Sequence, residues 1–522
     1  MNITQPGARP TRICTRRIMQ RVYTRCTMQR VYTRCIVLIL LVCFVSGSMS
    51  CGFIVFNDPT TESTTPGTTE STTAESTTVT TTTAPPETTE PVDPREEADK
   101  LLDSLTDRNL GGAGVIIATT DDETICPLSS DDEVIAARSV ATRAVEDKYN
   151  ALIITDLVDS QSMLDAALEA VAADMYYADL LAVPLSRLGS FMQSGILMNM
   201  YSLPYTDYTK SYYYDVTDEA VFGGELMAAY GAANFNPEQL SCVYFNRDLI
   251  AEYSLDNPYE LVYSGDWTWE ELARLSREVN AAAGVYGHGT DYTTDEYISG
   301  AALSMGIDYV TNRANKAPFV SYMAEDKLAD DARGIVDILY KTLYNNSALA
   351  PEGDSSDLFT SGELLFDFGS LEKMTSLTNR DVNWGILPYP KYDEEQRHYL
   401  SPLSFDAPVF CALASTPNYE TSGLILEALN ASYYGYTNEI YMNERINYCL
   451  RDNDSINMLE LILDGATSDF AHMFASGFAS LANATYSAVK NAVTTRSTLT
   501  ALYQSWHSAA DSELAAAATI YE

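Results

Sequence analysis

Three short apolar runs alternate with amphipathic stretches between residues 115 and 200, and this alternation limits the fold more than any other feature of the chain. The runs Val115–Thr119, Leu152–Thr155 and Asp179–Val183 have the length and composition of buried strands. Residues 130–149 and 162–173 lie between them and have apolar residues at helical spacing. This order of strand and helix predicts a parallel sheet flanked by helices, so the chain belongs to the α/β class.

The ends of these elements indicate where a ligand would bind. Ser130 and Glu133 form a capping box before the first helix, and Pro184 stands at the first-turn position of a helix that follows the third strand. Ligands of open α/β sheets bind beyond the carboxyl ends of the strands. Ser186 and Arg187 follow such an end and are therefore candidate ligand-binding residues.

A second strand–helix passage lies between residues 221 and 275. Gly223-Gly224 is a tight-turn signal between two apolar runs, and Leu240–Phe245 has strand length. Thr268 to Glu271 then forms a capping box, followed by apolar residues at helical spacing. We expect a strand that crosses the molecule here, and then a helix.

Length and charge describe a large, acidic, globular protein. A chain of 522 residues favours two or three domains, and 46% hydrophobic residues provide a sizeable core. Eight of the 32 basic residues lie in residues 1–50, which contain no acid, so the remaining chain has 24 basic and 72 acidic residues. A body this acidic repels phosphate backbones, which argues against binding of nucleic acid.

The N-terminal 50 residues have the pattern of a signal peptide. The apolar run Ile36–Val45 is too short for a stable membrane span, and arginines precede it while small residues follow it. The phrase Met-Gln-Arg-Val-Tyr-Thr-Arg-Cys occurs at 19–26 and again at 28–35. We therefore expect translation to begin at Met28 or Met19.

Residues 51–98 are predicted to form a disordered stalk. Ser48-Met49-Ser50-Cys51-Gly52 resembles the lipobox of bacterial lipoproteins, in which the cysteine is lipidated, although Ser48 replaces the usual leucine. Ordinary signal cleavage near Cys51 is the alternative. The stretch from Pro59 to Pro94 is almost wholly Thr, Ser, Glu and Pro and cannot bury apolar area. A eukaryotic mucin-like stalk has the same composition and is the rival interpretation.

Motifs for metal, nucleotide or covalent chemistry are missing from the sequence. The four histidines are scattered without the spacing of a zinc site, and no Gly-x-Ser-x-Gly or phosphate-loop sequence occurs. The 72 acids offer many pairs for glycoside hydrolysis and single out none. The four cysteines after Cys51 include no Cys-x-x-Cys pair, and we interpret them as buried apolar residues with room for one disulfide: Cys126, Cys242, Cys411 and Cys449.

Several phrases of the chain, taken in order, resemble the extracellular solute-binding proteins of ABC importers, in the large group that includes the maltose-binding proteins. The similarity covers about residues 110–522, and a clostridial-type branch of the group is the most similar. The phrases are Gly224-Glu225-Leu226, Phe245-Asn246-Arg247-Asp248-Leu249, Thr268-Trp269-Glu270-Glu271-Leu272, Leu365-Phe366-Asp367-Phe368-Gly369-Ser370, Pro388-Tyr389-Pro390-Lys391-Tyr392 and Arg451-Asp452-Asn453-Asp454-Ser455.

The resemblance implies a periplasmic-binding-protein-like type II fold, with two lobes joined by a hinge of two or more crossings. The first crossing would lie in the 221–275 passage, and the return crossing within Tyr399–Ser415. The expected first lobe comprises 99–238 and 403–470, and the second lobe comprises 239–402 and 471–522.

Carried over by position, the resemblance places ligand-binding residues between the lobes. A cleft carboxylate falls near Glu238 or Gln239, and a stacking aromatic falls on Tyr486. Ser370 ends a strand of the second lobe, and Asp406 lies in the middle of the return crossing. Two other stacking positions fall on Val183 and Leu371, which are not aromatic, so the maltodextrin site is not reproduced.

The function implied is that of a substrate-binding lipoprotein on the extracellular face of the cell membrane, anchored through Cys51. It would bind a carbohydrate, an oligosaccharide above all, and deliver it to the permease of an ABC importer. It would be a monomer that uses no cofactor, metal or nucleic acid and catalyses no reaction. A stalked cell-surface glycoside hydrolase and a glycan adhesin are the alternatives.

Overall fold

The computed structural model describes residues 93–306, 310–311, 319–320, 334–344, 348–484, 490–492, 495 and 499–520. Two compact units divide the chain, Met1–Glu87 and Thr88–Glu522, and the fold given below is that of the second unit. The predicted signal peptide, the stalk up to residue 92, Cys51 and Tyr486 lie outside the described residues. The predicted stalk extends too far, because residues 94–98 are helical and belong to α2 (Pro94–Ser104), where Pro94 occupies the first turn and Ala98 is buried. No helix of the described part is both long enough and apolar enough to cross a membrane.

The first lobe is built on a four-stranded sheet with the order β13-β3-β1-β2. Strands β1 (Ala113–Thr119), β2 (Ala151–Leu157) and β3 (Leu180–Pro184) are parallel, with Val115 opposite Ile153 and Ile117 opposite Leu180. Strand β13 (Pro408–Cys411), from much later in the chain, joins β3 in antiparallel orientation. The predicted parallel sheet is therefore present, with one added edge strand.

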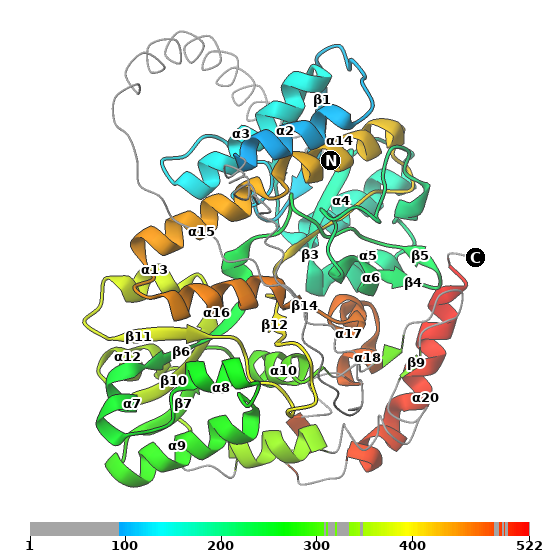
Figure 1. Cartoon of the computed structure of the whole chain (residues 1–522). Coiled ribbons are helices and arrows are strands. Elements are labelled where there is room, and N and C mark those ends of the chain that lie inside the picture. The colour runs from blue at the N-terminus through cyan, green and yellow to red at the C-terminus, as the bar shows by residue number, and fades with distance from the viewer. Residues whose placement is uncertain are drawn as a thin grey trace, which may run out of the picture. The chain divides into compact units, whose positions relative to one another are not determined.

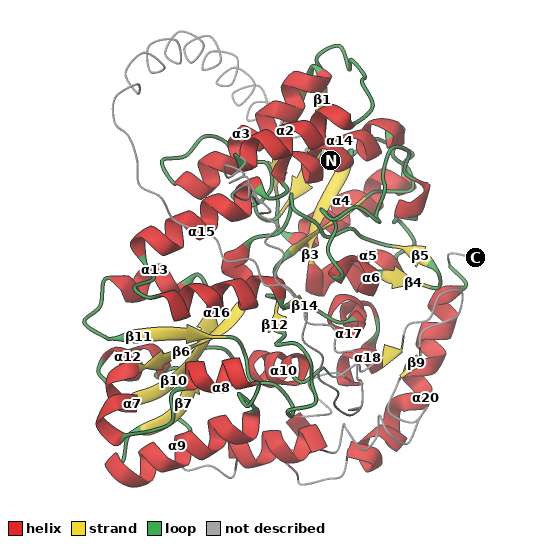
Figure 2. Cartoon of the chain, viewed as in Figure 1, coloured by secondary structure: helices red, strands yellow, loops and turns green. Residues whose placement is uncertain are grey.

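Helices cover this sheet and connect its strands (Figures 1 and 2). Helix α3 packs on β2, and α14 and α15 pack on α2 and α3. The helices of the first lobe are α2 (Pro94–Ser104), α3 (Glu133–Tyr149), α4 (Ser160–Ala172), α5 (Leu188–Gln193), α6 (Val216–Glu219), α14 (Tyr419–Tyr433) and α15 (Tyr436–Tyr448).

The second lobe is built on another four-stranded sheet, with the order β11-β6-β10-β7. Strands β10 (Leu364–Ser370) and β7 (Tyr286–Thr290) are parallel, whereas β6 (Ser241–Asn246) is antiparallel to both β10 and β11 (Trp384–Leu387). Its helices are α7 (Arg247–Tyr253), α8 (Pro258–Ser264), α9 (Trp269–Ala283), α10 (Thr294–Ser304), α12 (Ser355–Thr360), α13 (Lys373–Thr378) and α16 (Asn453–Asp464). The predicted α/β fold with two lobes is confirmed.

Short elements complete the unit. Strands β4 (Val221–Phe222) and β5 (Glu225–Leu226) form a hairpin whose turn, as predicted, is Gly223-Gly224, with positive φ at both glycines. The others are η1 (Leu185–Arg187), η2 (Met200–Ser202), η3 (Pro237–Gln239), η5 (Tyr340–Tyr344), η6 (Ala475–Gly477), β8 (Val310–Thr311), β9 (Phe319–Val320), β12 (Ser401–Pro402), β14 (Ala466–Thr467), α17 (Phe470–Phe474), α18 (Ala479–Ala484) and α20 (Leu499–Ala518).

Two predicted helix starts differ from the structure. Asp132, not Ser130, is the N-cap of α3, because its carboxylate accepts from the amides of both Val134 and Ile135, while Ser130 accepts from the Asp132 amide. Pro184 ends β3 opposite Pro408 and precedes the helical segment instead of occupying its first turn; η1 follows it and leads directly into α5. Thr268 is the N-cap of α9 as predicted, but the Glu271 carboxylate pairs with Arg274.

The chain passes between the lobes more often than the predicted division allows. Within the predicted first-lobe range 403–470, helix α16 instead packs on β11 of the second lobe, where Arg247 pairs with Asp452 at its N-cap. Helix α17, predicted to lie mostly in the second lobe, packs on η1 and α5 of the first lobe. Its phenylalanines have aromatic partners there, since Phe470 and Phe474 contact Phe222. Long-range aromatic packing thus decides which lobe receives the C-terminal helices.

Candidate functional site

Two segments that connect the lobes lie side by side and form a junction. The amide of Ser404 donates to the carbonyl of Gln239 at 2.9 Å, and Leu240 is bridged to Leu403. The Leu371 amide, just after β10, donates to the carbonyl of Leu240 at 2.9 Å. The two connecting segments, residues 236–240 and 401–407, therefore lie together next to the carboxyl end of β10.

The first lobe contributes the loop after β1. Thr119 ends this strand, and the Asp121 carboxylate caps the turn by accepting from the amides of Glu123 and Thr124. The side-chain amide of Asn236, at the start of the first crossing, donates to the Thr124 hydroxyl at 3.1 Å. Cys126 completes the loop with φ of +48°, which a residue with a side chain rarely adopts. The loop and the crossing are thus held together.

Arg138 fixes this loop from within the core. Its guanidinium is buried and donates to the backbone carbonyls of Thr124, at 2.9 Å, of Ala233, at 3.3 Å, and of Phe235. Burial lowers its pKa, which the ring of Tyr433 partly offsets. One side chain from α3 therefore sets both the loop after β1 and the chain that leads into the first crossing.

Ser186 and Arg187, the two ligand-binding residues predicted after β3, make their contacts in different places. The Ser186 amide donates to the carbonyl of Phe405 in the return crossing at 3.0 Å, so Ser186 belongs to the junction. Arg187 extends away and donates to the side chain of Gln161 on α4 at 3.0 Å. Asp406 is exposed, and its amide donates to the Ser404 hydroxyl.

Glu238 and Gln239 occupy η3 in the first crossing. The Glu238 carboxylate pairs with Arg445 of α15, which also lies over the ring of Tyr441. Burial raises the pKa of Glu238, and the charge of Arg445 opposes that change. The side-chain oxygen of Gln239 is buried and accepts no hydrogen bond from the described residues. It is thus an acceptor that a ligand hydroxyl could satisfy.

The second lobe contributes the end of β10. Ser370 pairs with Ser241, the first residue of β6, and both serines lie near the phenol of Tyr292. Burial raises the pKa of Tyr292, so its phenol stays neutral. Tyr389, in the Pro-Tyr-Pro phrase, is buried near Ser241 as well. Two serines and two tyrosines therefore meet at this strand end.

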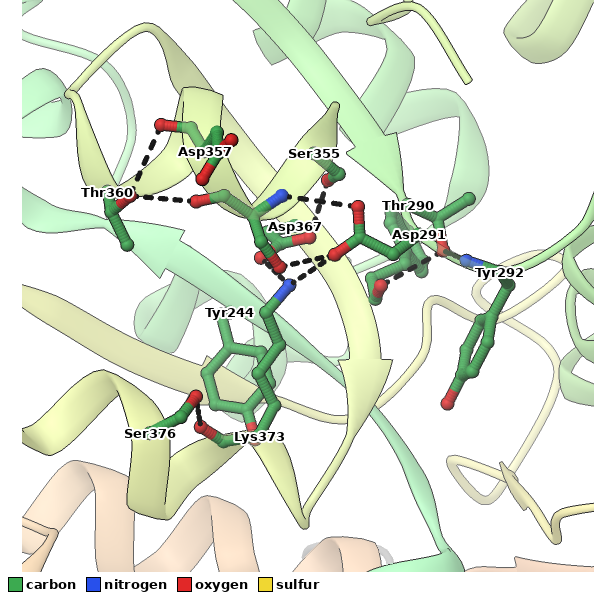
Figure 3. Close-up of polar contacts among 12 residues, drawn as sticks. Tyr244, Thr290, Asp291, Tyr292, Ser355, Asp357, Thr360, Asp367, Lys373 and Ser376 are labelled. Atoms are coloured by element: carbon green, nitrogen blue, oxygen red, sulfur yellow. Dashed lines mark hydrogen bonds and ion pairs between the residues drawn. The ribbon is translucent and has the colours of Figure 1, made fainter. Parts of the chain in front are cut away.

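A buried ion pair anchors the turn behind Ser370. The Lys373 ammonium lies between Asp367 of β10 and Asp291 after β7, as Figure 3 shows. Ser355 donates to Asp367 at 2.6 Å. Burial raises the pKa of Asp367 despite Lys373, whereas hydrogen bonds from Ser356 and the charge of Lys373 outweigh burial and lower the pKa of Asp291. The turn Leu371–Glu372 is held next to the first crossing, because the Glu372 amide donates to the Glu238 carbonyl.

The structure brings four predicted residues to the junction: Ser186, Glu238, Gln239 and Ser370. Asp406 lies in the 401–407 segment of the junction but is exposed, Arg187 makes its contact at the margin with Gln161, and Tyr486 lies outside the described residues. The sequence reasoning missed Arg445 and Tyr292. Arg445 lies 207 residues from Glu238 in the sequence and belongs to no motif, so no sequence pattern indicates it. Tyr389 belongs to the Pro-Tyr-Pro phrase and could have been predicted as a site residue from it.

Other features of the described residues do not add to this site. A pocket of about 640 Å³ lies in the second lobe, lined by residues of the N-terminal half of α9 and by Ile338, Lys341 and Thr342. Within the described ranges, no group of three or more acidic, histidine or cysteine side chains could hold a metal ion. The four cysteines of the described residues are all buried, and no disulfide joins any two of them.

Neither a family model nor a curated protein matches the chain. Among solved structures, the chain is similar to the GacH receptor of Streptomyces glaucescens GLA.O, which was determined unliganded and in complex with acarbose and an acarbose homolog. The two have 13% sequence identity and a TM-score of 0.45, over 78% of this chain and 97% of the receptor. A similarity at this level does not identify a ligand for this chain.

Proposed function

We propose that this protein is an extracellular substrate-binding protein that captures a carbohydrate between its two lobes. The observation that carries the proposal is the junction, where polar groups from both sheets meet the connecting segments. Ser186 approaches from the end of β3, Ser370 from the end of β10, and Gln239 lies in the crossing. Strand ends of α/β sheets are the usual place for ligands.

The chemistry of the junction suits a neutral ligand rich in hydroxyl groups. Ser241, Ser370 and Tyr292 supply hydroxyls that donate and accept, while the Gln239 oxygen accepts. The Glu238 carboxylate is 34% exposed beside Arg445 and can accept further hydrogen bonds. Tyrosine rings can stack on the apolar face of a sugar ring. These groups bind and orient a sugar without a chemical step.

Lobes joined by several crossings can close around a ligand by hinge motion, and a ligand that contacts both lobes favours the closed state. We further propose that Cys51 is lipidated and holds the protein on the outer face of the cell membrane, with the segment between Cys51 and α2 as a tether. The closed monomer would then deliver the sugar to the permease of an ABC importer. The sequence phrases and the signal-peptide pattern support these steps.

A thermal-shift screen of the full chain against monosaccharides and oligosaccharides tests the proposal. A ligand at about 100 times its Kd stabilises the folded state by about 2.7 kcal/mol, which raises the melting temperature. We expect one class of sugar to do so and to be recovered intact. Recovery of cleaved sugar would instead indicate a hydrolase, and no shift with any sugar would refute carbohydrate binding.

A variant pair tests whether the junction is the site. In Gln239→Ala the candidate acceptor is lost, and we expect about a tenfold weaker sugar affinity, since an unmet hydrogen bond costs about 1–2 kcal/mol. Gln161→Ala is the matched control, because it removes an amide side chain that bonds Arg187 at the margin. Equal affinities of the two variants would place the sugar elsewhere.

A further inference from the structure

A group of exposed tyrosines lies on the first lobe, apart from the junction. We name it the tyrosine surface: Tyr201 in η2, Tyr205 four residues later and Tyr419 at the start of α14. Their exposed fractions are 51%, 41% and 44%, unusually high for aromatic side chains. Four chain steps separate the first two, so their Cα atoms lie within about 14 Å.

Contacts from other parts of the chain bring the third tyrosine to the same surface. Arg108 lies over the ring of Tyr205, with 5.9 Å to the ring centroid, and donates to its hydroxyl at 3.1 Å. The same guanidinium pairs with Glu420, the neighbour of Tyr419, at 2.8 Å. In addition, Gly423 on the next turn of α14 packs against the carbonyl of Pro204. The start of α14 therefore lies against the loop that holds Tyr205.

The backbone at Tyr205 is strained. Its φ is +72°, in the left-handed region that favours glycine and that a bulky residue seldom adopts. Strain of this kind persists where the surrounding structure holds it, and it is concentrated at functional sites. Glycine would occupy the position without strain, so the sequence retains an exposed ring at the expense of stability.

A network of packed tyrosines supports the ring of Tyr201. This ring packs edge-on against Tyr208 at 5.8 Å, and Tyr208 packs on Tyr213 at 4.9 Å. The hydroxyl of Tyr213 donates to the buried carboxylate of Glu427 at 2.9 Å. Because these contacts hold Tyr201, and Arg108 holds Tyr205, little rotamer entropy of these two rings is lost on binding.

The charges around the rings indicate the kind of ligand. Arg108 is balanced by Glu420, and the nearby Lys210 is balanced by Asp207 at 3.5 Å. The chain as a whole has a formal net charge of −40 and repels polyanions. Asp218 adds a negative charge near Tyr201. A surface of this kind disfavours anions and fits a neutral, polyhydroxylated ligand, with rings for the apolar sugar faces and charged side chains for the hydroxyls.

We propose that the tyrosine surface binds a neutral polysaccharide. Each exposed ring covers only one face of a sugar, so single contacts are weak, and a polymer gains by occupying several of them at once. This site is separate from the junction and does not depend on capture of a small sugar there. It would keep the protein on the polymer from which small sugars are released.

Native electrophoresis of the full chain in gels that contain amylopectin, xylan or laminarin tests the proposal. We expect at least one polymer to retard the protein. The double variant Tyr201→Ala/Tyr205→Ala should then bind about tenfold more weakly, as the loss of two ring contacts implies. Tyr448→Ala is the matched control, because that ring is 66% exposed on α15, and it should be retarded like the parent.

Tyr205→Gly separates binding from folding. It removes the ring and also the strain, so we expect weaker retardation with a melting temperature no lower than that of the parent. A clearly lower melting temperature would assign the ring a structural role and overturn the proposal. A parent protein that no polymer retards, or a double variant retarded like the parent, would overturn it as well.

Two further measurements distinguish binding at the tyrosine surface from binding at the junction and from dimer formation. The melting-temperature shift with small sugars should be the same in the parent and in Tyr201→Ala/Tyr205→Ala, so failure at the junction and failure at the tyrosine surface can be told apart. Sedimentation velocity tests the other occupant, a second copy of the chain. If the parent forms a dimer and the double variant does not, the tyrosine surface binds a second copy of the chain. That result would refute polysaccharide binding.

Discussion

The two lobes stabilise their buried charges in different ways. In the first lobe, Arg138 is buried among backbone carbonyls, and Glu427 accepts from the hydroxyls of Tyr212 and Tyr213. In the second lobe, Asp367 is paired with Lys373, and the buried His288 is held by neutral partners. Neutral hydrogen-bonding groups thus stabilise the buried charges of the first lobe, whereas an opposite charge stabilises Asp367 in the second lobe. The lobes should therefore respond differently to substitution and to pH.

Arg138→Met tests the first lobe and should have the largest effect. The change leaves the carbonyls of Thr124, Ala233 and Phe235 without their donor in the core, and each unmet acceptor costs about 1–3 kcal/mol. We expect the free energy of unfolding in urea to fall by about 4 kcal/mol. Arg138→Lys should lie between, because it keeps one donor group, and Arg143→Met on the same helix is the control. A loss below about 1 kcal/mol would contradict the assigned role of Arg138.

Asp367→Asn is the corresponding test of the second lobe. It leaves the Lys373 ammonium with Asp291 alone, and breaking a buried ion pair typically costs about 3–5 kcal/mol. We expect a loss of about 3 kcal/mol, because Asp291 still compensates Lys373 in part. Asp291→Asn, which changes the more exposed carboxylate, should cost less. The double variant Asp367→Asn/Lys373→Met should recover stability, and a further loss in it would refute the pairing.

The same contrast explains how much could be predicted from the sequence. Three of the four strands of the first sheet were predicted in part, since Val115–Thr119 lies within β1, Leu152–Thr155 within β2, and Asp179–Val183 overlaps β3. Hydrophobic patterning and turn residues are local signals, and they suffice for elements of this kind. Contacts between segments that are far apart in the sequence leave no such local signal. Neither the contact of α16 with β11 nor the pairing of Glu238 with Arg445 follows from any local pattern.

The candidate site was predicted in the same uneven way. Ser186 and Ser370 were found because strand ends can be recognised in sequence, and the structure places both at the junction. Arg187 has the same sequence signal but turns to Gln161 on α4, since side-chain direction depends on neighbours from distant segments. The α3 cap was misassigned by two residues, because serine and aspartate at 130 and 132 are both good capping residues.

The pH dependence of stability distinguishes a neutral buried group from a paired one. Burial lowers the pKa of His288 to about 4, below its ordinary 6.5, so the unfolded chain binds more protons between these values. Stability should therefore rise with pH from about 4 to 6.5, by about 3 kcal/mol. The difference between the parent and His288→Asn isolates this contribution. Equal slopes of the two proteins in urea titrations across that window would contradict it.

Glu238→Gln should have the smallest effect on stability and the most specific one on the junction. Burial raises the pKa of Glu238, so its charged form is already disfavoured, and its pairing with Arg445 near the surface contributes about 1 kcal/mol or less. Because a raised folded-state pKa makes the native state bind the extra proton, this carboxyl weakens stability as pH rises above its ordinary value. Glu238→Gln should flatten that slope, whereas the control Glu252→Gln, at an exposed position of α7, should not. If Glu238 also accepts a hydrogen bond from a sugar hydroxyl, Glu238→Gln should lose sugar affinity without losing stability. That result would assign the Glu238 carboxylate a role in binding instead of folding.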